Sequence, residues 1–409
     1  MRENVYNTTD PQKLLDLKRQ EADALLDVMR TINQNDLKVA QLCQITKYVL
    51  LAQLGVRKMA FYYQEKDDWY EGMRHGFAEL SDAAKLEVFS FDKTEVIDPE
   101  RHPSLSEIKA EFVVPISHRE DMQAAFVIAE FADTDVEAQN DLLFIETLGN
   151  ILSVAIRNRQ LFQEQMEQEF LRKELEVAGT IQSQMLISNF SRFKEIDVYG
   201  LNFAHHGVGG DFYDVIKKGK GVTFVCIADV SGKGIGAALL MSNLQANLRA
   251  LCAQYTDPIP IVEDLNQVLY PITKGEKFVT LFLARIDADT RTITYVNAGH
   301  NYPIFVSNSE LTHLESGCIF LGFMPSIEAK ASQMSFEKDD ILFMYTDGLI
   351  EQENNTGEMF GQTRVEHQLI LHEERSSEKI IHHVMQDLED FSVQTEAVDD
   401  ITMLSVKFL

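Results

Sequence analysis

The sequence is short of cysteine, of positive charge and of long apolar runs, and each shortage excludes a class of protein. Its four cysteines are scattered and form no Cys-x-x-Cys pair, so they predict neither a disulfide framework nor a zinc or redox site. Lysine and arginine number 37 against 64 acidic residues, a net charge of −27. This charge disfavours nucleic acid and anionic membrane surfaces as partners.

No apolar run approaches the roughly 18 residues that cross a bilayer. Residues 1–10 also lack the apolar core of a signal peptide. We therefore expect a cytoplasmic protein. The 409 residues, 45% hydrophobic and 25% charged, are typical of a globular chain with two or three domains.

Residues 1–160 predict a helical lead-in followed by a sheet and a further helix. Apolar residues recur at helical spacing over residues 10–54. Short β-branched or aromatic runs at 56–64, 69–77, 112–118 and 123–131 predict an antiparallel sheet, and a new apolar helical stripe starts at Asp141.

The segments "EFVVPISH" and "DLLFIETLGNILSVAIRNRQLF" within this part resemble a GAF domain, a small-molecule sensory module. The resemblance covers residues 112–162. It implies an α/β sensory domain that receives a small-molecule or protein signal, or else a spacer that only holds a dimer together.

Residues 161–190 predict a linker helix. Residues 163–186 contain no proline and one glycine, Gly179, so one helix is expected to run on into the next domain. Its apolar residues recur at the spacing of a coiled-coil seam, whose complementary positions carry glutamine. The apolar positions are Leu171, Leu175, Ala178 and Met185, and the glutamines are Gln168 and Gln182. We expect a short, weak parallel seam that makes a homodimer; a solvated linker helix is the alternative.

Residues 191–409 predict a layered α+β domain. Strand candidates are 195–203, 221–230, 280–286, 292–297, 303–307, 340–345 and 401–408. Helices are expected at 236–253, 260–270 and 377–391. Strands in succession with helices between groups of them do not fit a simple βαβ repeat.

Four aspartates of this domain stand at the ends of apolar strands. Asp211 lies in "VGGDFYDV", Asp229 ends "VTFVCIADV", Asp347 ends "ILFMYTD", and Asp399 precedes "ITMLSVKFL" together with Asp400. One aspartate beside a glycine is more often a turn residue. Four in one domain favour a site for hard divalent cations, because converging carboxylates repel one another unless a cation neutralises them.

Five ordered motifs resemble the SpoIIE-type branch of the PPM metal-dependent serine/threonine protein phosphatases. They are "VGGDFYDV", "IADVSGKGIGAALLM", "ITYVNAGHNYPIFV", "MYTDGLIEQENNTGEMFG" and "DDITMLSV", and the resemblance covers residues 174–409. It implies a β sandwich flanked by helices and two Mn²⁺ or Mg²⁺ ions. The implied substrate is a phosphoserine or phosphothreonine protein of a partner-switching signalling pathway.

The same resemblance implies a role for each motif residue. Asp229 would bridge the two ions, with the Val230 carbonyl as a further ligand of one of them. Asp347 and Asp399 would complete the shell of the other ion, and Asp211 would sit at the rim of the site, binding an ion directly or through water.

The residue that protonates the leaving group stays open. Lys233, His300 or a second water could serve, and His300 could equally be a turn residue of "NAGHN". The glycines after Asp229 match neither a dinucleotide-binding motif nor a P-loop, so no organic cofactor is expected.

A different class of function is a catalytically silent protein that uses this fold for ligand sensing and partner capture. The complete set of ligand aspartates argues against it. The leading prediction is a phosphoprotein phosphatase regulated by an N-terminal sensory domain.

Overall fold

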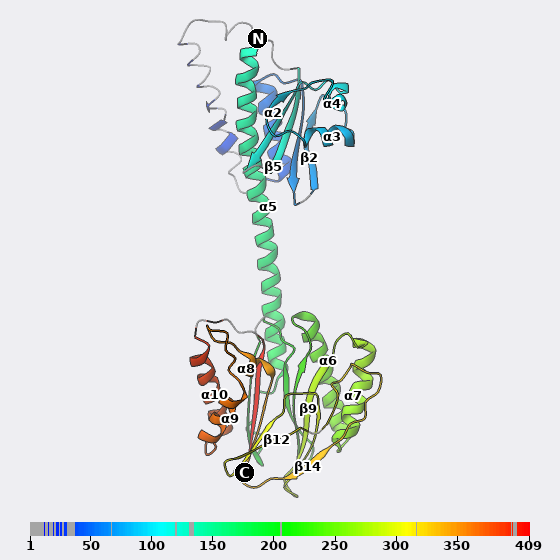
Figure 1. Ribbon diagram of the computed structural model, residues 1–409, viewed down its shortest axis with the longest axis vertical. Coiled ribbons are helices and arrows are strands. Elements are labelled where there is room, and N and C mark those ends of the chain that lie inside the picture. Colours follow the sequence, from blue (N-terminus) through cyan, green and yellow to red (C-terminus); the bar gives the residue numbers. More distant parts are fainter. Residues whose placement is uncertain are drawn as a thin grey trace. The chain divides into compact units, whose positions relative to one another are not determined.

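The computed structural model describes residues 37–409 except 67, 119–120, 131–134, 205–206, 316, 394 and 396–398, together with scattered residues between 12 and 30. The chain divides into two compact units, residues 1–169 and 170–409 (Figure 1). The predicted helical lead-in is therefore described only in part. Its last helix is α2 (Val39–Gln53), while residues 1–11 and 31–36 lie outside the described residues.

A five-stranded antiparallel sheet organises the N-terminal unit, with strand order β2-β1-β5-β4-β3. The strands are β1 (Lys58–Glu65), β2 (Asp68–His75), β3 (Glu95–Val96), β4 (Phe112–His118) and β5 (Asp121–Ala129). The helices α3 (Asp82–Val88) and α4 (Pro103–Glu107) connect them.

Both faces of this sheet are covered, because alternate residues of a strand point to opposite sides. Met59 and Phe61 of β1 pack in one core with α2 and the long helix α5 (Asp135–Met185). Ala60 and Tyr62 pack in a second core with α3 and α4. The mixed α/β character expected of this unit is present, and its assignment as a GAF domain stays a prediction.

Helix α5 is the predicted linker helix, and it is longer than the sequence pattern indicated. It begins at Asp135 in the N-terminal unit and ends at Met185 in the C-terminal unit, a single helix of 51 residues (Figure 1). No described helix of the chain is long and apolar enough to span a bilayer.

Two sheets form the centre of the C-terminal unit. The first has the order β13-β10-β9-β8-β7, with β14 also paired to β10, and the second has the order β12-β11-β15-β16-β6. The strands of the first are β7 (Phe212–Lys217), β8 (Val222–Val230), β9 (Val279–Asp287), β10 (Thr292–Ala298), β13 (Gly317–Cys318) and β14 (Ser332–Ser335). Those of the second are β6 (Ile196–Phe203), β11 (Ile304–Ser307), β12 (Glu310–His313), β15 (Ile341–Tyr345) and β16 (Ile401–Phe408).

The two sheets pack face to face around an apolar core, and helices cover their outer faces. Val225 and Phe282 of the first sheet meet Leu342 and Leu404 of the second in this central core. Helices α6 (Ile235–Gln254) and α7 (Pro258–Thr273) pack on the outer face of the first sheet. Helices α9 (Gln362–Leu371) and α10 (Ser377–Phe391) pack on that of the second, and the short α8 (Asp347–Glu351) follows β15.

Candidate metal centre and its surroundings

Each sheet of the C-terminal unit contributes two of the predicted aspartates. Asp211 directly precedes β7, and Asp229 is the penultimate residue of β8. Asp347 begins α8 just after β15, and Asp399 lies two residues before β16. Neighbouring strands in both sheets therefore deliver carboxylates to the same end of the sandwich.

The Asp211 side chain is buried in this site and held by a hydrogen bond. It is only 4% exposed, and Thr346 Oγ1 donates a hydrogen bond to its Oδ2 at 2.7 Å. Burial, followed by the charge of Asp229, raises the pKa of the Asp211 carboxyl well above its ordinary value. Thr346 in turn accepts a hydrogen bond from the Thr402 backbone N–H at 2.9 Å, which joins β15 to β16 at this point.

The carboxylates share one electrostatic environment. Burial, followed by the charges of Asp347, Asp399 and Asp400, raises the pKa of Asp229 to about 7, against a hydrogen bond with Asp211 that lowers it. Burial and the charge of Asp399 likewise raise the pKa of Asp347. Such mutual repulsion is what a bound cation relieves.

Two further charged residues belong to this cluster. Lys233 Nζ lies 3.0 Å from Asp399 Oδ2, and its charge lowers the pKa of Asp347. Glu351, at the end of α8, has a pKa raised by burial and by Asp347 and Asp399. The sequence analysis missed Glu351; its position one helical turn after Asp347 was the available signal.

His300 holds two segments of the site together. Its Nε2–H donates to the Tyr345 backbone carbonyl at 3.2 Å, which leaves Nδ1 to accept from Thr280 Oγ1 at 2.8 Å. Burial lowers its pKa to about 4. A neutral imidazole with both nitrogens engaged fits the structural alternative of the sequence analysis and not a proton donor to a leaving group.

The glycine loop before Asp211 is held from two sides. The Gly210 N–H donates to Asp400 Oδ2 at 2.9 Å, and a methyl group on Gly210 would lie 2.8 Å from the Val230 carbonyl oxygen. Gln182 of α5 makes two hydrogen bonds to the Gly209 backbone, from Nε2 to the carbonyl at 2.7 Å and to Oε1 from the N–H at 3.0 Å. Gln182 was expected on a coiled-coil seam; the structure instead places its amide against this loop.

The donor set fits hard divalent cations, since it consists of carboxylate and carbonyl oxygens. Among the described residues, no group of three or more His, Cys, Asp or Glu side chains stands close enough together to hold a metal ion as arranged. The raised pKa values are compatible with this finding, because Coulomb interactions act over longer distances than coordination bonds. The acids are close enough to raise one another's pKa.

Comparison with solved structures identifies the fold of the C-terminal unit as that of the PP2C phosphatases. The SiaA PP2C domain of Pseudomonas aeruginosa superposes with a TM-score of 0.54 and 20% sequence identity, over 59% of this chain and 99% of that one. At this identity the likeness establishes the fold alone.

Sequence comparison then finds a matching family model. Residues 219–409 match the profile of "Stage II sporulation protein E (SpoIIE)", in agreement with the resemblance of the motifs. The chain is similar to the phosphoserine phosphatase RsbU of Bacillus subtilis, with 26% identity over 59% of this chain and 71% of RsbU. It is also similar to protein IcfG of Synechocystis, with 26% identity over 64% of this chain and 46% of IcfG. The chain therefore matches less than half the length of that second relative.

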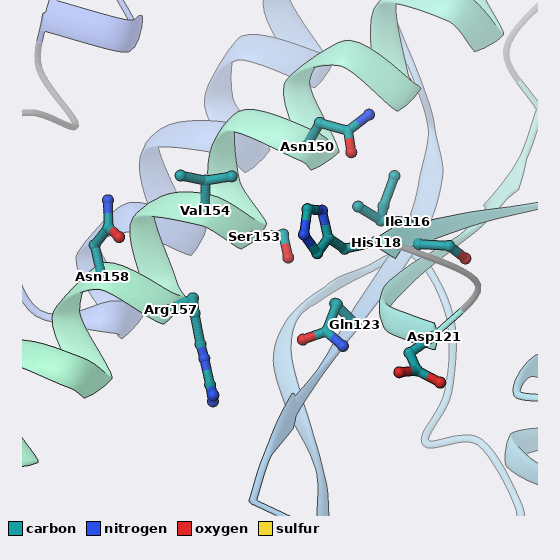
Figure 2. Close-up of a pocket in the computed structure, with 10 residues that line it drawn as sticks. Ile116, His118, Asp121, Gln123, Asn150, Ser153, Val154, Arg157 and Asn158 are labelled. Atoms are coloured by element: carbon teal, nitrogen blue, oxygen red, sulfur yellow. The ribbon is translucent and has the colours of Figure 1, made fainter.

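A separate cavity of about 450 Å³ lies in the N-terminal unit, between α5 and the β4–β5 strand pair (Figure 2). His118 extends from β4 toward α5 beside Ser153, and Arg157 projects from the same helix. The remaining lining residues are Ile116, Ser117, Asp121, Gln123, Asn150, Val154 and Asn158. Among the described lining residues Asp121 is the one acid, a contrast with the strongly acidic chain.

Proposed function

We propose that the C-terminal domain hydrolyses phosphoserine or phosphothreonine in a signalling protein of a partner-switching pathway, with two Mn²⁺ or Mg²⁺ ions. The observation that carries this proposal is the acidic cluster in a region that matches the SpoIIE profile, where burial and neighbouring carboxylates raise the pKa of Asp211, Asp229 and Asp347. A cytoplasmic location belongs to the same proposal.

Asp229 would bridge the two ions, and the Val230 carbonyl would be a further ligand of one of them. Asp347 and Asp399 would complete the coordination shell of the other ion. When bound, the ions activate a water molecule for in-line attack and neutralise the phosphoryl oxygens. The hydrogen bond from Thr346 holds the Asp211 carboxylate in place, so Asp211 would bind an ion directly or orient a water molecule bound to it. No phosphoenzyme is needed.

The remaining residues of this chain position the ligands or balance their charge. Lys233 pairs with Asp399, and its ammonium is the one sequence-predicted proton donor that stays exposed at the site. His300 connects Thr280 to the carbonyl of Tyr345 and so fixes the end of β15, two residues before Asp347. We therefore assign His300 a positioning role and keep Lys233 as the candidate for leaving-group protonation.

The test is hydrolysis of p-nitrophenyl phosphate by the full chain with Mn²⁺, with Mg²⁺ and with EDTA. Asp229→Asn and Asp347→Asn should each abolish hydrolysis while leaving the circular dichroism spectrum unchanged. Full activity in EDTA, or in either variant, contradicts the proposal.

The substrate class is tested separately. A panel should contain phosphoserine proteins of partner-switching pathways, sugar phosphates and nucleotides. We expect phosphoproteins to be preferred, because the glycine loop matches no nucleotide-binding motif and specificity then has to come from a docking surface. Much faster hydrolysis of the small phosphates would contradict this assignment.

We also propose that the N-terminal unit receives the signal and that the cavity beside Arg157 takes an anionic small molecule. Arg157 and His118 make no hydrogen bond or ion pair with the residues that the structure describes, and Ser117, Gln123, Asn150, Ser153 and Asn158 add further polar groups to the cavity lining. Arginine beside neutral donors is suited to carboxylate or phosphate groups. This observation favours the sensing function that the sequence analysis kept as an alternative. Loss of citrate binding to the full chain in Arg157→Ala, measured by calorimetry, would support it, and equal binding would contradict it.

The signal would pass along α5, with a homodimer formed through residues 161–190. Two observations support signal transfer along α5. The helix is uninterrupted, and its Gln182 makes hydrogen bonds to Gly209, two residues before Asp211. Sedimentation of the full chain tests the dimer, and a monomer at all concentrations would contradict it.

A further inference from the structure

Lys277 stands beside the glycine turn of the metal centre and pairs with no residue that the structure describes. It lies between α7 and β9, in the register position opposite Gly232, because β8 and β9 pair Asp229 with Thr280 and Val230 with Val279. The next residue, Phe278, fixes this register further. Its backbone N–H donates to Ser231 Oγ at 2.8 Å, and its carbonyl accepts from the Ser231 N–H at 2.9 Å.

The ammonium group of Lys277 extends across this turn. A methyl group on Gly236 would lie 2.9 Å from Lys277 Nζ, and one on Gly232 would lie 3.9 Å from it. Both distances place the positive charge over the segment that directly follows Asp229 and Val230. The absence of a side chain at position 236 makes this position of the ammonium available.

The two lysines at the turn, Lys233 and Lys277, differ in their contacts. Lys233 is paired with Asp399, whereas Lys277 makes no hydrogen bond or ion pair with any residue that the structure describes. Lys277 also lines a cleft of about 350 Å³ together with residues of α6 and of the C-terminal end of α7. The cleft is further lined by Gly236, Leu239, Leu240, Asn243, Ile272, Thr273 and Glu276.

A phosphorylated substrate has to bring a dianion toward five or more carboxyl groups. Metal ions, when bound, would offset that charge at the centre, and a cation at the edge would offset it along the approach. Lys277 is the lysine at this turn whose charge no described acidic residue already neutralises. We propose that Lys277 binds a phosphoryl oxygen of the substrate and so determines substrate affinity; the inference rests on the proposed phosphatase function.

The test combines kinetics with direct binding. Lys277→Ala and Lys277→Arg are compared with wild type in KM and kcat for p-nitrophenyl phosphate and for a phosphoserine peptide. The Mg²⁺-loaded proteins are also titrated with inorganic phosphate by calorimetry. Loss of one charge-assisted hydrogen bond predicts a rise in KM of about tenfold for both substrates and an equal loss of phosphate affinity. Lys277→Arg keeps the positive charge, so it should keep KM and phosphate affinity close to those of wild type.

Two further variants separate charge from structure. Lys274→Asn removes a lysine from the same connection, and asparagine tolerates its left-handed backbone with φ of +50°. It should behave as wild type. Gly236→Ala places a methyl group against the ammonium and should weaken phosphate binding when Lys277 is present, with no additional effect in the Lys277→Ala background.

Each negative outcome has its own meaning. Wild-type KM and phosphate affinity in Lys277→Ala would overturn the inference, and so would a loss confined to the peptide, which would indicate contact with a flanking acidic side chain. The same effects in Lys274→Asn would also overturn it, because they would reflect general charge. Failure of the wild-type protein itself to hydrolyse either substrate would instead contradict the proposed function.

Discussion

Replacement of Asp229 by asparagine should abolish hydrolysis and at the same time stabilise the metal-free protein at alkaline pH. In the folded protein, burial and neighbouring acids raise the pKa of Asp229 from 3.8 to about 7. A carboxyl group with a raised pKa binds its proton more tightly in the folded state. Stability is therefore lost as pH rises from the ordinary pKa through the folded one, between about pH 4 and pH 7.

The size of the effect follows from the same values. A difference between 3.8 and about 7 corresponds to at most about 4 kcal/mol in the free energy of unfolding. Asp211 shares a hydrogen bond with Asp229, so we expect roughly half of this, about 2 kcal/mol, to be recovered by asparagine. For a domain of this size that is a rise in Tm of about 4–8 °C.

Thermal melting of the metal-free proteins at pH 4 and pH 8 measures this directly. The Tm of Asp229→Asn should be higher than that of wild type at pH 8 and equal to it at pH 4. Mn²⁺ should raise the Tm of wild type only. Asp289→Asn, in an exposed turn, is the control and should change neither result. A variant that melts below wild type at pH 8 would refute the argument that carboxylate repulsion strains this site.

Three further substitutions test the surroundings of the centre. Thr346→Val removes the hydrogen bond to Asp211 and should weaken Mn²⁺ binding about tenfold in a metal titration, whereas unchanged affinity would show that this bond does not orient the carboxylate. His300→Phe should lower the free energy of unfolding by about 1–3 kcal/mol without moving the pH profile of hydrolysis above pH 5, and a shifted acidic limb would restore His300 as a proton donor. Gly179→Ala would put a methyl group 1.7 Å from the Gly207 carbonyl oxygen, so the Mn²⁺ concentration for half-maximal activity should rise; an unchanged value would separate α5 from the loop.

Much of the secondary structure could be predicted from the sequence because long, strongly patterned elements dominate this fold. The expected strand at 112–118 is β4, and the expected helix at 377–391 is α10. Short elements were missed, among them α3, α4, α8, α9, β12 and β14, because four to ten residues carry little periodicity. Strand β7 was also missed, because the two glycines before Asp211 masked the strand that follows this residue.

The candidate site could be predicted in its residues but not in its contacts. The position of each aspartate beside a strand end is a local pattern, so the sequence contains it. The burial of Asp211 depends on Thr346, 135 residues away in sequence, and the position of Lys277 opposite Gly232 depends on the pairing of β8 with β9. Such contacts are made by tertiary packing, and no local signal records them.

The two glutamines of α5 illustrate this limit and separate two accounts of how the helix could act. The sequence pattern placed Gln168 and Gln182 on one coiled-coil seam, so that changing both to leucine would lock a dimer. In the structure Gln168 is exposed, whereas Gln182 makes two hydrogen bonds to the Gly209 backbone. The single variants therefore have different expected results.

If control passes through the seam, Gln168→Leu should tighten the dimer in sedimentation and shift phosphatase activity, because an apolar residue strengthens a weak coiled coil. If control passes through the direct contact, Gln182→Leu alone should change activity and the Mn²⁺ requirement, because it frees the loop that positions Asp211. Gln168→Leu would then leave both unchanged. Wild-type dimerisation, activity and Mn²⁺ requirement in both variants would show that α5 is only a tether between the two units.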